Sequence, residues 1–111
     1  MLEKHLVNQF IMFLKATGYF VWRQNNTPIF DRRKNLFRRM PTHTPRGIPD
    51  IVGMTKDGRF LSVEVKLPGG VQSDFQLQFE AETKRSGGIY ILARSLEELE
   101  AKLKTAEADN A

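Results

Sequence analysis

The stretch that decides the fold runs from Pro49 to Lys66 and reads Pro49-Asp-Ile-Val-Gly-Met54, Thr55-Lys-Asp-Gly58, Arg59-Phe-Leu-Ser-Val-Glu-Val-Lys66. Two runs rich in β-forming residues flank Asp57-Gly58, a pair typical of β-hairpin turns. If a three-residue loop is centred on Asp57, with Gly58 in the left-handed conformation, Asp50 lies directly opposite Glu64. A strict two-residue turn would shift the register by one and put these carboxylates on opposite faces.

The first register has a chemical consequence. Side chains that face each other across two strands lie about 4.5–5.5 Å apart, and like charges there repel, so we expect a cation between Asp50 and Glu64. Strand alternation puts Lys66 on the face of Glu64 and turns Val65 away. This grouping suits a divalent metal and a phosphodiester. A solvated charged face is the alternative, and the nearly continuous apolar run at 89–92 argues against it.

Further motifs occur in a fixed order. They are Arg46-Gly-Ile-Pro-Asp50, then after thirteen residues Glu64-Val-Lys66, then Pro68-Gly-Gly70, Ser73-Asp-Phe-Gln76 and Gly87-Gly-Ile-Tyr90. Together they resemble the virus-type replication-repair nuclease (VRR-NUC) domain, a branch of the PD-(D/E)XK nuclease superfamily. The bare Pro-Asp and Glu-x-Lys pattern is weak, but the ordered set is much more specific. The resemblance extends from the first predicted helix to about Leu99.

The resemblance implies a restriction-endonuclease-like core and a metal-dependent DNA endonuclease. Short, stand-alone members of the family look like phage-type proteins that act as homodimers on branched DNA, such as four-way (Holliday) junctions or flaps. Cleavage would leave a 5′-phosphate and a 3′-hydroxyl. A two-fold dimer would match paired incisions in a symmetric junction.

The resemblance also implies roles for individual residues. Asp50 and Glu64, with the backbone carbonyl of Val65, would hold Mg²⁺ or Mn²⁺, and Lys66 would orient water or offset charge in the transition state. An acidic residue on the first helix can complete such a metal site, and Glu3 is the candidate on this helix. A favourable position of Glu3 at the positive end of the helix dipole is the alternative.

Gln76 has two interpretations that are compatible. Ser73 with Gln76 matches a capping box, in which the glutamine satisfies a backbone donor at the start of a helix. By resemblance, the same glutamine faces the metal-bound water or the scissile phosphate.

The expected class is α/β, with a mixed sheet flanked by helices in the order α-β-β-β-α-β-α. Helices are predicted over residues 2–17, 73–85 and 95–106, and strands over 19–24, 50–54, 59–66 and 89–93. The first helix carries an apolar stripe from Leu2 to Leu14, and the second helix should turn Phe75, Phe79 and Thr83 inward. We assign Trp22 to the core rather than to a base-stacking surface.

The 111 residues are expected to form one domain with a tail at 107–111 that is disordered. The chain contains no cysteine and two histidines, which argues against disulfides and against cysteine or histidine zinc sites. Its apolar runs are too short to span a bilayer, and no leader peptide is apparent. We therefore expect no membrane association and an intracellular location, in a bacterial or phage-infected cell.

Residues 25–48 form a predicted loop with a basic character. Its net charge is +5 within a chain of net charge +4. Such a segment is typical of a surface that contacts the phosphate backbone, and a solvated loop is the alternative. The candidate nucleic-acid-binding residues are Arg32, Arg33, Lys34, Arg38, Arg39 and Arg46.

Two other functional classes stay open. A DNA-binding module with a vestigial site would keep the basic segment and cleave nothing. A nuclease subunit of a larger replication, repair or restriction assembly would stay inactive until a partner protein positions the DNA.

Overall fold

The computed structural model describes residues 2–24, 30–37 and 43–109. The chain forms α1 (Glu3–Ala16), β1 (Phe20–Arg23), β2 (Phe30–Asp31), β3 (Leu36–Phe37), β4 (Ile51–Met54), β5 (Phe60–Val65), α2 (Asp74–Arg85), β6 (Ile89–Ala93) and α3 (Leu96–Asp109).

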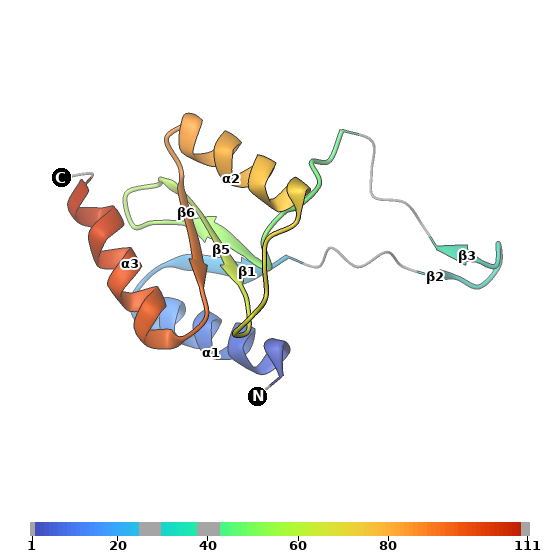
Figure 1. The fold of residues 1–111 in the computed structure, drawn as a ribbon, viewed down its shortest axis with the longest axis horizontal. Coiled ribbons are helices and arrows are strands. Elements are labelled where there is room, and N and C mark those ends of the chain that lie inside the picture. The colour runs from blue at the N-terminus through green and yellow to red at the C-terminus, as the bar shows by residue number, and fades with distance from the viewer. Residues whose placement is uncertain (1, 25–29, 38–42, 110–111) are drawn as a thin grey trace.

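A mixed sheet lies at the centre of the molecule (Figure 1). Its strand order is β1-β4-β5-β6, with β1–β4 and β4–β5 antiparallel and β5–β6 parallel. The parallel pair is joined through α2, because parallel neighbours need a crossover connection. The predicted α/β class with a mixed sheet flanked by helices is confirmed.

The register of the β4–β5 hairpin follows from its loop. Ile51 pairs with Val63 and Met54 with Phe60. The Thr55 amide donates to the Arg59 carbonyl at 2.8 Å, which closes the loop. Gly58 lies at φ +83°, in the left-handed region that glycine adopts readily. The hairpin is therefore centred on Asp57, and the predicted register is confirmed.

The two faces of the sheet differ in character. Helices α1 and α3 cover one face, and α2 crosses the other (Figure 1). The face toward α1 and α3 holds the hydrophobic core, which includes Leu6, Phe10 and Leu14 of α1, Leu61, Val63 and Val65 of β5, and Leu99 and Leu103 of α3. The α2 face buries polar groups, among them Ser62, Glu64 and Thr83. The predicted site residue Glu64 therefore lies on the α2 face.

Three predicted core positions are wrong. Leu2 precedes α1 and is 58% exposed, Trp22 is 43% exposed, and Phe75 is 45% exposed. Strand β1 is an edge strand, and α2 packs against β6 at the opposite edge, so no helix covers the α2 face of β1. On α2 itself only Thr83 is buried, so this helix contributes little to the core.

The ends of the chain and the basic segment also differ from expectation. Helix α3 continues to Asp109, so residues 107–109 are helical, whereas 110–111 lie outside the described residues. Within the expected loop, β2 and β3 pair as a separate two-stranded sheet, and Asn35 at φ +53° helps to turn the chain between them. This hairpin stands apart from the four-stranded sheet (Figure 1).

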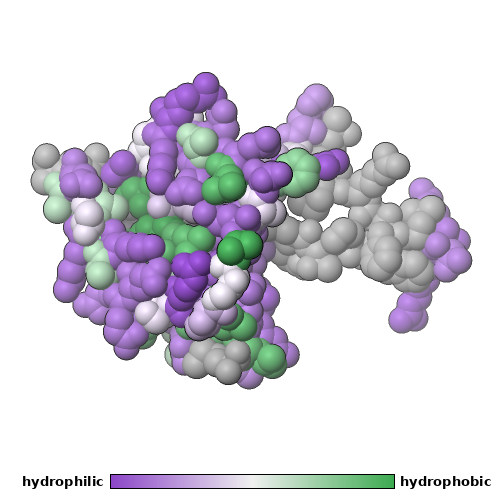
Figure 2. Space-filling view, viewed as in Figure 1, coloured by the Kyte–Doolittle hydropathy of each residue, from purple (hydrophilic) through white to green (hydrophobic). Residues whose placement is uncertain are grey.

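The surface seen in the same view is largely hydrophilic, and hydrophobic residues gather between α2 and α3 (Figure 2). Within the described part of the chain, no helix combines the length and the apolarity that crossing a membrane requires.

Candidate functional site

Two carboxylates meet on the α2 face where β1, β4 and β5 lie side by side. The Gln24 amide donates to the Asp50 carbonyl at 2.7 Å, which extends the β1–β4 register by one pair. The β4–β5 register, continued by one residue, sets Asp50 opposite Glu64. Because directly opposed residues share a face, both side chains lie on the α2 side of the sheet.

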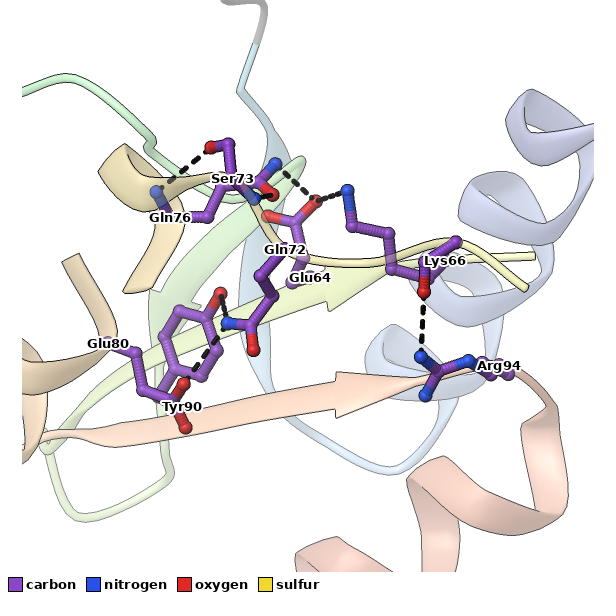
Figure 3. Close-up of polar contacts among 9 residues, drawn as sticks. Glu64, Lys66, Gln72, Ser73, Gln76, Glu80, Tyr90 and Arg94 are labelled. Atoms are coloured by element: carbon purple, nitrogen blue, oxygen red, sulfur yellow. Dashed lines mark hydrogen bonds and ion pairs between the residues drawn. The ribbon is translucent and has the colours of Figure 1, made fainter. Parts of the chain in front are cut away.

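Glu64 is almost completely buried, with 3% of its surface exposed. Its Oε1 accepts a hydrogen bond from Gln76 Nε2 at 3.1 Å and lies 3.9 Å from Lys66 Nζ. The two side chains reach this oxygen from opposite sides (Figure 3). Among the described residues, Glu64 Oε2 and Asp50 Oδ2 are buried without a hydrogen-bond partner.

Burial and neighbouring negative charges raise the pKa of both carboxyl groups. Burial, and then the charge of Asp50, raise the pKa of Glu64 from 4.5 to about 8, although Lys66 opposes the shift. Burial and the charge of Glu3 raise the pKa of Asp50, against a backbone hydrogen bond from Val65. The protein groups around the pair therefore do not compensate for ionisation of both carboxyls, as is common at functional sites.

Gln76 makes the predicted capping box and also contacts Glu64, whereas its role toward a metal-bound water or phosphate stays a prediction. Its side-chain Oε1 accepts a hydrogen bond from the backbone N–H of Ser73 at 2.8 Å. The Ser73 hydroxyl accepts one from the backbone N–H of Gln76, so the capping box is complete. The Nε2 group of the same side chain donates to Glu64. The first turn of α2 is therefore bound directly to the buried carboxylate.

Glu3 affects the carboxylate pair through its charge, and Val65 contacts the pair through its backbone. The charge of Glu3 raises the pKa of both Asp50 and Glu64, although its own side chain is exposed. Within residues 2–24, 30–37 and 43–109, no three His, Cys, Asp or Glu side chains form a group that could hold a metal ion. The Val65 side chain is buried in the core, so only its backbone faces the pair.

The donor set fits a hard divalent cation. Two buried carboxylate oxygens lack partners, and Mg²⁺ and Mn²⁺ prefer oxygen ligands. Mg²⁺ commonly binds through one or two carboxylates and retains several waters, so two protein ligands are sufficient. Lys66 beside the pair adds a positive charge where a phosphate would carry a negative one.

A polar network beside Glu64 was not predicted from the sequence. Gln72 Nε2 donates to the Tyr90 hydroxyl and to Glu80 Oε1, each at 3.1 Å (Figure 3). Burial raises the pKa of Tyr90, and the charge of Glu64 adds to that shift. Tyr90 alternates with Ile89 and Ile91, and this alternation was the one available signal that it faces away from the core.

The basic residues divide into two groups. Arg32, Arg33 and Lys34 are exposed in the turn between β2 and β3. The guanidinium of Arg46 lies 5.0 Å from the centre of the Phe75 ring, beside the start of α2. Arg38 and Arg39 lie outside the described residues.

Comparisons with protein-family models, with curated proteins and with solved structures found no match to this chain. The resemblance to the VRR-NUC domain therefore stays a prediction from the motifs.

Proposed function

We propose that this protein is a metal-dependent DNA endonuclease of the VRR-NUC type that hydrolyses phosphodiester bonds in branched DNA, such as four-way junctions or flaps. The observation that carries the proposal is the pair of buried carboxylates with unpartnered oxygens, bordered by Lys66 and Gln76. The element order, with a mixed sheet flanked by helices, is compatible with a restriction-endonuclease-like core.

In this proposal, Asp50 and Glu64 hold Mg²⁺ or Mn²⁺, and the Val65 carbonyl and Glu3 are further candidate ligands. The bound ion supplies Lewis-acid polarisation of the phosphodiester and a water of lowered pKa. Lys66 places its ammonium beside the reacting phosphate and offsets the charge that develops there. Gln76 holds Glu64 in position through one N–H of its side-chain amide, and the second N–H of that group can donate to a water or a phosphate oxygen.

Cleavage assays test the proposal directly. We would compare labelled four-way junction, flap and linear duplex DNA in the presence of Mg²⁺, Mn²⁺ or EDTA. Wild type should cut a branched substrate only with metal. Glu64→Gln should abolish cutting, and Lys66→Ala should reduce its rate by about 10²–10³-fold, the usual effect of removing one charge-stabilising group.

Glu80→Gln is the matched control for Glu64→Gln. Glu80 lies on the same face in the neighbouring polar network, and its carboxylate bonds to Gln72 and Lys84 rather than to the pair. This variant should retain cutting. Tight binding by wild type without cleavage in either metal would contradict the endonuclease proposal and favour a non-catalytic DNA-binding module or a subunit that needs a partner protein.

A homodimer belongs to the same proposal, because two sites related by a two-fold axis match a symmetric junction. Sedimentation of wild type with and without junction DNA would test it, and one protein chain per cleaved junction would contradict it.

A further inference from the structure

Large aromatic side chains are exposed on the same side of the molecule as the carboxylate pair. Phe20 is 64% exposed, Trp22 is 43% exposed and Phe60 is 40% exposed. Exposed apolar groups that gather on one face mark interaction sites in proteins. The sheet register shows how these rings relate to Asp50 and Glu64.

Cross-strand pairing arranges this face in three successive rows. The first row is Phe20, Met54 and Phe60; the second is Trp22, Val52 and Ser62; the third is Gln24, Asp50 and Glu64. Alternate residues of a strand share a face and are about 7 Å apart, and opposed residues are about 5 Å apart. Phe20 and Phe60 therefore lie two rows from the carboxylates on the same face, and Trp22 lies one row from Asp50.

A groove continues this surface toward α2. It has a volume of about 640 Å³, and its lining includes Arg46, Phe60, Phe75 and Phe79. The rings of Phe60 and Phe79 are 6.4 Å apart between centres, and Arg46 lies over the ring of Phe75. Phe60 belongs both to the groove and to the first row of the sheet. We call Phe20, Trp22, Phe60 and Phe75 the aromatic surface.

We propose that the aromatic surface binds the unpaired bases of a nucleic-acid strand by stacking, and so selects substrates with single-stranded nucleotides next to the cleaved bond. The inference rests on the proposed function. Flat rings beside a guanidinium match a base and its phosphate, since aromatic stacking and a cation are the usual means of holding single strands. Paired bases in a continuous duplex are stacked on one another and cannot lie on these rings.

The chemistry around the groove agrees with this occupant. Arg46 contributes a positive charge at the wall of the groove. Glu82 is the anionic residue of the lining, and it forms an ion pair with Arg85. The local charge therefore does not repel a phosphate backbone.

Trp22 is the single tryptophan of the chain, so its fluorescence reports on this surface alone. We would titrate the protein in EDTA with a short oligothymidylate and with a blunt duplex of equal length. The single strand should quench Trp22 fluorescence and bind more tightly than the duplex. EDTA prevents cleavage, so the measurement does not depend on the catalytic proposal.

Phe20→Ala tests the stacking without removing the fluorophore. It should weaken single-strand binding about 5- to 150-fold, the effect of losing one stacked base, and leave duplex binding nearly unchanged. Met12→Ala is the matched control, because Met12 is 71% exposed on α1, on the other side of the sheet. Since Phe20 is largely exposed, the variant should keep the circular dichroism and melting temperature of wild type.

Two results would overturn the inference. One is binding of the single strand with no quenching and no effect of Phe20→Ala. The other is self-association of wild type, measured by sedimentation, that Phe20→Ala removes, since β1 is an edge strand and the surface would then join two copies of the chain. If branched DNA is cut with metal while either result holds, the inference fails and the proposed function stands. Quenching and selective binding without any cleavage would support single-strand binding by the aromatic surface and would contradict the proposed function.

Discussion

Glu64 is the residue whose environment departs furthest from that of an ordinary surface carboxylate. It is buried beside Asp50, and its pKa rises to about 8. Its partners supply one amide and one ammonium to a single oxygen, which leaves the second oxygen without a partner. A site of this kind is costly in the absence of a cation, and the cost should be visible in the stability of the metal-free protein.

Glu64→Gln should therefore stabilise the metal-free protein at alkaline pH. Because the folded-state pKa is raised, the folded state holds a proton that the unfolded chain loses, so stability from this group is fully present below pH 4.5 and is lost as the pH rises to about 8. The variant does not ionise. Its advantage in unfolding free energy should grow to on the order of 2–4 kcal/mol above pH 8. Urea unfolding in EDTA across this range measures it.

Glu80→Gln should change the unfolding free energy with pH in the opposite direction. Hydrogen bonds from Lys84 and Gln72 lower the pKa of Glu80 against the effect of its partial burial, so its ionised form stabilises the fold as the pH rises. A difference between Glu64→Gln and wild type that does not vary with pH would show that Glu64 ionises normally.

At the scale of an element, α2 depends on a close approach by Gly47. Gly47 has φ +75°, and a Cβ atom there would lie 2.3 Å from the Phe75 carbonyl oxygen and 2.6 Å from the Gln76 nitrogen. Both are backbone atoms of the first turn of α2, which carries the contact with Glu64. The glycine that precedes Ile48-Pro49-Asp50 thus allows the helix to reach the carboxylate pair.

Gly47→Ala should destabilise the protein by roughly 2–5 kcal/mol, from the positive φ and from the displaced helix turn together. It should also slow the proposed cleavage reaction, because Gln76 would move away from Glu64. Gly87→Ala is the control: its φ is +89°, but no atom lies within 4 Å of the added Cβ, so only the backbone cost of about 1–2 kcal/mol remains. Urea unfolding gives both values, and equal losses would refute the steric explanation.

At the scale of the whole molecule, the basic hairpin and the proposed catalytic groups are separated. The carboxylate pair lies in the four-stranded sheet, whereas Arg32, Arg33 and Lys34 lie in the turn of a hairpin that stands apart from it (Figure 1). In the proposed function, a nucleic acid that contacts both must extend well beyond the carboxylate pair. The hairpin should therefore contribute affinity of an electrostatic and sequence-independent kind.

Replacing Arg32, Arg33 and Lys34 by serine should weaken binding of single strands and duplexes alike. Each lost phosphate contact should make the slope of log K against log salt concentration shallower by about one unit. Fluorescence anisotropy over a range of salt measures the slope. Replacement of Lys15 and Lys104, exposed on α1 and α3, should change it little, and an unchanged slope in the hairpin variant would exclude phosphate contacts there.

Features that depend on neighbours along the chain could be predicted from the residues alone. The turn at Asp57-Gly58 limits the hairpin to two registers, and the expected pairing of Asp50 with Glu64 at a metal selects the one that the structure has. The capping box of Ser73 and Gln76 is equally local, since both partners lie within one turn. The order of helices and strands follows from periodicity, and with it the α/β class.

Which side chains are covered depends on the packing of the elements and could not be predicted. Trp22 and Phe75 are large aromatic residues of the kind that usually lie in a core. Helix α2 packs toward β6, however, and both residues stay exposed. The network of Gln72, Glu80 and Tyr90 depends on the parallel pairing of β5 with β6, which joins residues far apart in the chain. Burial is a property of packing between elements, and local patterns carry no information on which element covers which face.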